Sequence, residues 1–105
     1  MALRIINIKG TSDYKRSDSW IELWRQATGR EPTRCYETNC FRTDLVGAHV
    51  QIEGKRHTKW YIVPLCHGAN HRDIKSTEVR EDALFMGVTD GQVYTTDDLR
   101  AELDY

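Results

Sequence analysis

Two short stretches of this chain share one spacing: residues 35–40 read CYETNC, and residues 66–71 read CHGANH. Each stretch carries a metal-ligating side chain at both ends, with four residues between them. Such local pairs suit a tetrahedral metal site, because each short loop can direct two ligands at one ion. Thiolate and imidazole ligands favour zinc over magnesium or calcium. The spacing therefore predicts a zinc site formed by Cys35, Cys40, Cys66 and a histidine.

The histidine of this predicted site has two candidates. His67 directly follows Cys66, and neighbouring side chains in an extended segment point apart. His71 lies at the far end of the short loop, which favours it as the fourth ligand. Ala69 stands where the commoner two-residue spacing would place a cysteine. Four protein ligands would close the site, so we expect the zinc ion to be structural rather than catalytic.

The number of cysteines favours a metal site over disulfides. The chain has three cysteines, which cannot all pair with one another. Its first residues lack a basic stretch followed by a long apolar run, so no secretory signal is predicted. We therefore expect a cytoplasmic protein, in which disulfides are uncommon. The alternative is that the three thiols are unrelated buried side chains.

The composition predicts one folded domain over residues 1–105. Hydrophobic residues make up 39% and charged residues 30%, as in a globular protein, and no apolar run is long enough to span a membrane. The charge is uneven, because residues 1–60 carry 11 Lys or Arg against 7 Asp or Glu, and residues 61–105 carry 4 against 9. A surface for a polyanion such as DNA would therefore use the first part, with the candidates Arg42, Lys55, Arg56 and Lys59.

Local patterns predict two helices and four strands. A helix is predicted before residue 29, because apolar side chains recur there at helical spacing, namely Trp20, Leu23, Trp24 and Ala27. Gly29 is placed to end this helix. Strands are predicted at residues 3–8, 45–52, 59–65 and 83–88. The two middle strands would form a hairpin, and Thr95 or Thr96 would cap a short final helix.

Further motifs follow the cysteine pair. Residues 47–50 read GAHV, residues 61–66 read YIVPLC, and Asn70 precedes His71. With these motifs, residues 35–72 resemble the HNH family of ββα-metal nucleases. The resemblance implies an α+β fold, a small zinc-stabilised ββα-metal (treble-clef-like) domain, here preceded by an N-terminal helix.

The resemblance also implies a reaction and its residues. In that family a strand histidine activates water and a divalent cation stabilises the cleaved phosphate, so the implied general base is His49. Asn70 and His71 lie near the family's last metal-binding position, which makes Asn70 the second implied catalytic residue. A histidine near its ordinary pKa can take a proton at neutral pH. The alternative is that His49 is a packed strand histidine hydrogen-bonded to the backbone. The expected function is a DNA endonuclease that uses Mg²⁺ or another divalent cation besides the structural zinc.

The chain departs from the family pattern at two positions. Ala48 stands where many members carry a cation ligand, and Tyr61 replaces the asparagine that orients the base. If His71 binds zinc, it cannot also hold a catalytic cation. These departures leave a second function open, a non-catalytic zinc-stabilised module that binds nucleic acid or another protein. A third function is a hydrolase that uses Cys66 as a nucleophile with His49, which zinc-bound thiolates would exclude.

Overall fold

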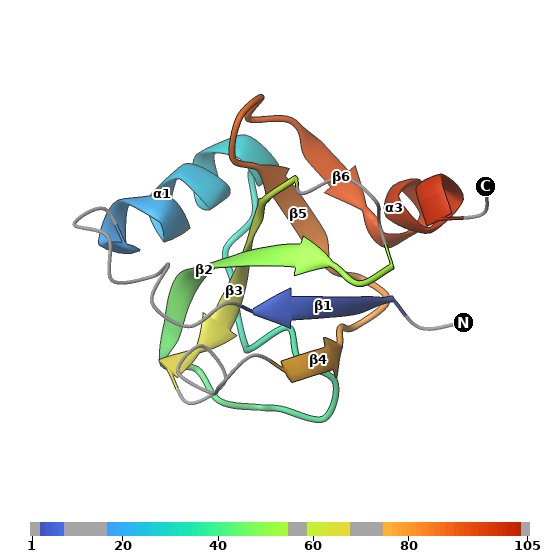
Figure 1. Cartoon of the computed structure of the whole chain (residues 1–105). Helices are drawn as coiled ribbons and strands as arrows, with labels where there is room; N and C mark the ends of the chain where they lie inside the picture. Colours follow the sequence, from blue (N-terminus) through green and yellow to red (C-terminus); the bar gives the residue numbers. More distant parts are fainter. Residues whose placement is uncertain (1–2, 8–16, 55–58, 68–74, 104–105) are drawn as a thin grey trace.

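The computed structural model describes residues 3–7, 17–54, 59–67 and 75–103, and its main feature is one antiparallel sheet. The sheet has six strands, β1 (Arg4–Asn7), β2 (Leu45–Ile52), β3 (Tyr61–Cys66), β4 (Lys75–Glu78), β5 (Leu84–Gly87) and β6 (Val93–Thr95). Their spatial order is β4-β1-β2-β3-β5-β6. The described helices are α1 (Ser17–Thr28) and α3 (Thr96–Leu103). Figure 1 shows the sheet curling into half of a barrel.

The β2–β3 hairpin forms the middle of the sheet. Leu45 pairs with Cys66 at one end of the hairpin, and Val50 pairs with Tyr61 at the other. On the outer side of β2 lies β1, and on the outer side of β3 lies β5. All six residues of β3 are buried. Because side chains alternate between the two faces of a strand, both faces of β3 must be covered.

One face of the sheet carries a large apolar core. Ile5 lies opposite Ile52, and strand alternation extends this face through β2, β3 and β5. Its fully buried side chains are Ile5, Val50, Val63, Leu65 and Phe85. Burying each such side chain contributes about 1.5–3 kcal/mol to folding. This core therefore fixes the position of the strand ends that bear functional side chains.

Helix α1 covers the opposite face of the hairpin and packs against β2, β3 and β5 (Figure 1). The close approach requires a glycine, because a Cβ atom at Gly47 would lie 2.6 Å from the backbone nitrogen of Ile21. Trp24 is fully buried, and its indole N–H donates to the carbonyl oxygen of Leu84 at 2.9 Å. The helix is followed by Gly29 in the left-handed region, with a φ of 67°.

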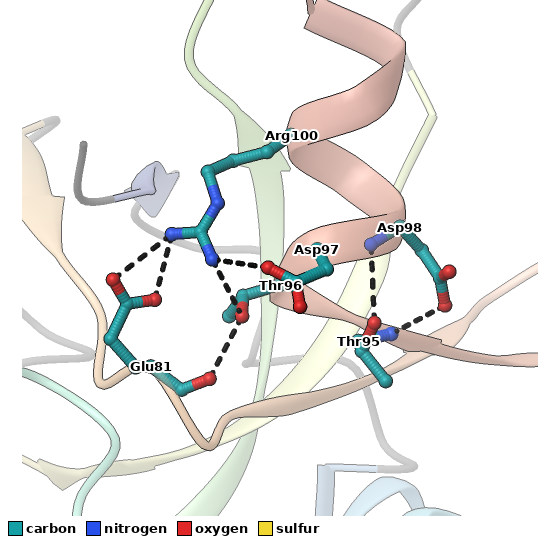
Figure 2. A network of polar contacts seen from close by, with 6 residues as sticks. All are labelled: Glu81, Thr95, Thr96, Asp97, Asp98 and Arg100. Atoms are coloured by element: carbon teal, nitrogen blue, oxygen red, sulfur yellow. Dashed lines mark hydrogen bonds and ion pairs between the residues drawn. The ribbon is translucent and has the colours of Figure 1, made fainter.

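Helix α3 is fixed to the sheet by a polar network, which Figure 2 shows. The backbone N–H of Asp98 donates to Thr95 Oγ1 at 3.1 Å, and the backbone N–H of Thr95 donates to the Asp98 carboxylate at 2.9 Å. This reciprocal pair is a capping box. The hydroxyl of Thr96 donates to the carbonyl oxygen of Glu81 at 2.8 Å, and Arg100 pairs with the Glu81 carboxylate at 2.7 Å. The helix is therefore anchored to the turn before β5.

The predicted fold class is wrong. A ββα-metal domain is a hairpin followed by one helix, whereas here the hairpin is the centre of a six-stranded, curled antiparallel sheet. Four strands, β1, β4, β5 and β6, come from outside residues 35–72. The α+β, treble-clef-like arrangement with an added N-terminal helix is therefore replaced by a half-barrel in which α1 covers one face of the hairpin.

Most individual elements agree with the sequence patterns. The predicted strand at 45–52 is confirmed, and those at 3–8, 59–65 and 83–88 are confirmed within two residues at each end. Strands β4 and β6 were not predicted. Thr95, of the two cap candidates, precedes the first residue of α3. Neither of the helices described here has the length and apolar character needed to cross a membrane.

Candidate metal centre

Three cysteine sulfurs converge at one end of the central hairpin. The Sγ atoms of Cys35, Cys40 and Cys66 all lie within 4.8 Å of one another. The Sγ atoms of Cys40 and Cys66 are 3.8 Å apart. Zinc–sulfur bonds of about 2.3 Å to one ion bring thiolates to separations just below 4 Å. The three thiols therefore lie close enough to bind a metal ion.

Cys66 is held by the hairpin itself. It is the last residue of β3 and pairs with Leu45, the first residue of β2. The ladder continues one step further, because the backbone N–H of His67 donates to the carbonyl oxygen of Asp44 at 3.1 Å. Cys66 is therefore a candidate ligand held at a strand end, only 3% exposed.

Cys35 and Cys40 lie on one tight loop after α1. The backbone N–H of Cys35 donates to the carbonyl oxygen of Arg42 at 2.9 Å, which closes the loop. Within it, the N–H of Cys40 donates to the carbonyl oxygen of Glu37 at 3.1 Å. Asn39 takes a φ of 66°, a conformation that asparagine tolerates better than most residues. The loop thus directs both thiols to the same side.

Backbone hydrogen bonds dock this loop on the sheet. The N–H of Tyr36 donates to the carbonyl oxygen of Pro64 on β3 at 3.0 Å, and the N–H of Thr38 donates to that of Glu78 on β4 at 2.9 Å. The N–H of Arg80 returns a bond to the carbonyl oxygen of Tyr36, also at 2.9 Å. The cysteine loop is therefore positioned by β3 and β4, two strands that lie far from it in sequence.

Burial changes the acidity of the deepest thiol. Cys35 is fully buried, and this desolvation raises the pKa of its thiol to about 12. Backbone donors from Cys66 and Glu37 lower it in part, whereas the neighbouring thiol of Cys40 raises it further. A proton must therefore leave Cys35 when a metal ion binds, and the ion's charge supplies the stabilisation that solvent cannot.

A cation lies beside the cluster. The hydrogen bond with Asp44 is the main reason that the pKa of Arg42 is raised, and the charges of Cys66 and Cys40 add to this effect. The Arg42 guanidinium donates to the Asp44 carboxylate at 3.0 Å. Three thiolates around one divalent ion leave a net negative charge, which this guanidinium can partly offset.

The histidine ligand is not found among the described side chains. His67 is exposed, and the metal-ligating group in the described ranges consists of the three cysteines without it. The alternative ligand, His71, lies outside the described residues, as does Asn70, the second predicted catalytic residue. The structure therefore brings together the three predicted cysteines and leaves the fourth position to further argument.

His49, the predicted general base, lies apart from this cluster in a packed aromatic setting. It is 9% exposed and pairs with Ile62 across the hairpin. Its ring meets Trp20 at 4.9 Å and Trp60 at 6.4 Å, both edge to face. Burial lowers the pKa of His49, and its Nδ1 has no hydrogen-bond partner in the described structure. Along β2, the four residue steps from Leu45, the partner of Cys66, to His49 span roughly 13 Å.

A surface hollow adjoins the cysteine loop and was missed by the sequence patterns. It has a volume of about 450 Å³, and we call it the Phe41 hollow after its exposed apolar side chain; its charged lining includes Arg34, Glu78, Arg80 and Asp82. Phe41 is 71% exposed, and the guanidinium of Arg34 lies 4.3 Å from its ring centroid. The available signal was an aromatic residue directly after Cys40 in a polar stretch.

Comparison of the chain with models of known protein families, with curated proteins and with solved structures finds no match in any of the three. The class of the molecule therefore follows from its own geometry, a curled antiparallel half-barrel with a three-cysteine cluster at the end of its central hairpin. The resemblance to HNH nucleases stays a prediction.

Proposed function

We propose that Cys35, Cys40 and Cys66 hold a structural zinc ion in a domain that serves as a non-catalytic binding module. The observation that carries the proposal is the convergence of three sulfurs within 4.8 Å. Thiolate ligands favour zinc, and a small domain gains folding free energy from the bound metal. The guanidinium of Arg42 complements the charge of such a centre. A reducing, cytoplasmic location belongs to the proposal, because it keeps the thiols available as ligands.

We assign the fourth ligand to His71. Closed zinc sites have four protein ligands, and the described cysteines provide three of them. His67 follows the strand end directly, is exposed and is not part of the cluster. In the sequence after His67, the next histidine is His71, five positions from Cys66. This assignment makes the centre Cys₃His and leaves no ligand position for a reacting water.

The assignment predicts different effects for two neighbouring histidines. His71→Ala should weaken zinc binding by at least about tenfold, the lower end of what even outer-shell changes cost. His67→Ala is the matched control and should leave the affinity unchanged. Competition with a chromophoric chelator measures both affinities. Equal affinities in the two variants, or a loss confined to His67→Ala, would remove His71 from the centre.

The burial of His49 supports a non-catalytic function. A general base must reach the water it deprotonates, directly or through one other water. The imidazole of His49 is almost fully covered, with Trp20 and Trp60 on it. This chain also has Ala48 at the position where many HNH nucleases carry a cation ligand. The endonuclease with His49 and Asn70 as catalytic residues and Mg²⁺ as cofactor stays a prediction, which plasmid nicking with added Mg²⁺ or Mn²⁺ tests.

A protein is the partner that the described surface favours. The Phe41 hollow mixes acidic and basic groups around an exposed aromatic ring, and Glu78 and Asp82 would repel a phosphate backbone. Of the basic residues predicted to face DNA, Arg42 is paired with Asp44, and the ammonium group of Lys59 lies 5.8 Å from the ring centroid of Tyr94. Lys55 and Arg56 lie outside the described residues. Exposed aromatic residues of this kind commonly anchor protein interfaces.

Peptide selection tests this function. We expect peptides selected from a phage-displayed random library on the zinc-loaded protein to lose at least about tenfold in affinity on Phe41→Ser. Leu23→Ser on α1 is the matched control, since Leu23 is another exposed apolar residue, at 39%. Fluorescence anisotropy measures the affinities. If the selected peptides bind Phe41→Ser as tightly as the wild-type protein, the Phe41 hollow is not the binding surface. If the protein nicks plasmid DNA and His49→Ala abolishes the nicking, the protein is a nuclease rather than a non-catalytic module.

A further inference from the structure

The three cysteines of the cluster differ in how far they are covered. Cys35 is fully buried and Cys66 is 3% exposed, whereas Cys40 is only partly buried. An oxidant from solvent therefore meets Cys40 first, because oxidation of cysteine follows exposure and thiolate character. This asymmetry gives the cluster one accessible sulfur and two covered ones.

The accessible sulfur has a close partner in the cluster. The Sγ atoms of Cys40 and Cys66 are 3.8 Å apart, and a disulfide requires about 2.05 Å, so the sulfurs must approach by roughly 1.8 Å. Cys66 is fixed in the β3 ladder. Cys40 lies instead on a loop, where its N–H donates to the carbonyl oxygen of Glu37, and it is followed by the exposed residues Phe41 and Arg42.

We propose that Cys40 and Cys66 form a peroxide-sensitive modification site, in which a disulfide between them ejects the zinc ion. The inference rests on the proposed zinc centre and adds a way to regulate it. Two of the three described ligands are lost when this bond forms, and Cys35 remains as a thiol. Cys35 and the assigned ligand His71 are then the two protein ligands left, which are too few to close a tetrahedral site, so zinc is released.

The reaction balances with hydrogen peroxide as the oxidant. The Cys40 sulfur attacks one peroxide oxygen, the O–O bond breaks, and one water leaves, which gives a sulfenic acid. The Cys66 sulfur then attacks the Cys40 sulfur, and the sulfenic oxygen leaves as the second water. Two thiols and one peroxide thus give one disulfide and two waters, and the sulfur pair supplies both electrons. A dithiol reductant reverses the change by thiol–disulfide exchange.

Peptide mapping of the zinc-loaded wild-type protein tests the pair directly. After peroxide treatment and alkylation of the remaining thiols, trypsin leaves Cys35 and Cys40 on the fragment 35–42 and Cys66 on the fragment 60–72. We expect these fragments to be cross-linked, with the alkyl group on Cys35. Zinc release, followed with a zinc-sensitive dye, should reach about one ion per disulfide and reverse with a dithiol and zinc.

Two variants sharpen the test. Cys35→Ser keeps the proposed pair and should still form the cross-link, whereas Cys40→Ser should slow cross-linking by at least about tenfold. A cross-link through Cys35, or zinc release without any cross-link, would overturn the inference even if either variant folds poorly, because the wild-type map decides. A preparation that contains no zinc before peroxide is added contradicts the proposed function instead.

Discussion

At the residue scale, His49 shows how burial redirects a chemically capable side chain. Its imidazole lies between Trp20 and Trp60, and burial lowers its pKa below the ordinary value. The neutral form is therefore favoured in the folded chain. Such a ring packs as an aromatic side chain at neutral pH, which suits the face of β2 that α1 covers.

This burial predicts a pH dependence of stability. Above about pH 6.5, the ordinary pKa, His49 is neutral in both states and contributes no slope. As the pH falls below that value, the unfolded chain takes up the proton first, so the free energy of unfolding falls by at most about 1.4 kcal/mol per pH unit until the folded pKa is reached. His49→Gln should remove this component. Urea unfolding at fixed zinc activity measures the free energy of unfolding of both proteins at each pH. If this free energy changes with pH in the same way in the wild-type protein and in His49→Gln, the prediction is contradicted.

Sequence reasoning worked at the residue scale where covalent spacing limits geometry. Cys35 and Cys40 share a tight loop that their separation in sequence already suggested. The meeting of that loop with Cys66 depends on hydrogen bonds to Pro64 and Glu78, which no local pattern predicts. The accessibility of His49 likewise depends on tryptophans from other elements, so the sequence left open whether His49 is a general base or a packed strand histidine.

At the element scale, strands with strong apolar character were predictable and polar edge strands were not. β2 and β3 are rich in apolar and β-branched residues, and the structure has both near the expected bounds. β4 reads KSTE and becomes a strand because it pairs with β1. β6 is only three residues long and is defined by its pairing with β5. Such edge strands owe their conformation to a neighbour rather than to composition.

At the scale of the whole molecule, the predicted fold class was wrong because the resemblance that implied it covered residues 35–72 alone. The register of β1 on β2 and of β5 on β3 joins segments far apart in sequence. That register is set by which faces are buried, a property of the complete sheet. The long-range pairing of β4 with β1 also places β4 beside the cysteine loop. Both the fold and the candidate site therefore depend on strand pairing that local sequence patterns do not predict.

The most direct measurement of the central claim is thermal unfolding of the reduced protein with and without a zinc chelator, together with elemental analysis. We expect about one zinc per chain. We also expect a loss of about 15 °C or more in Tm on chelation, since binding at a thousandfold excess over Kd contributes about 4 kcal/mol. A protein that carries no transition metal and keeps its Tm in chelator would contradict the zinc centre.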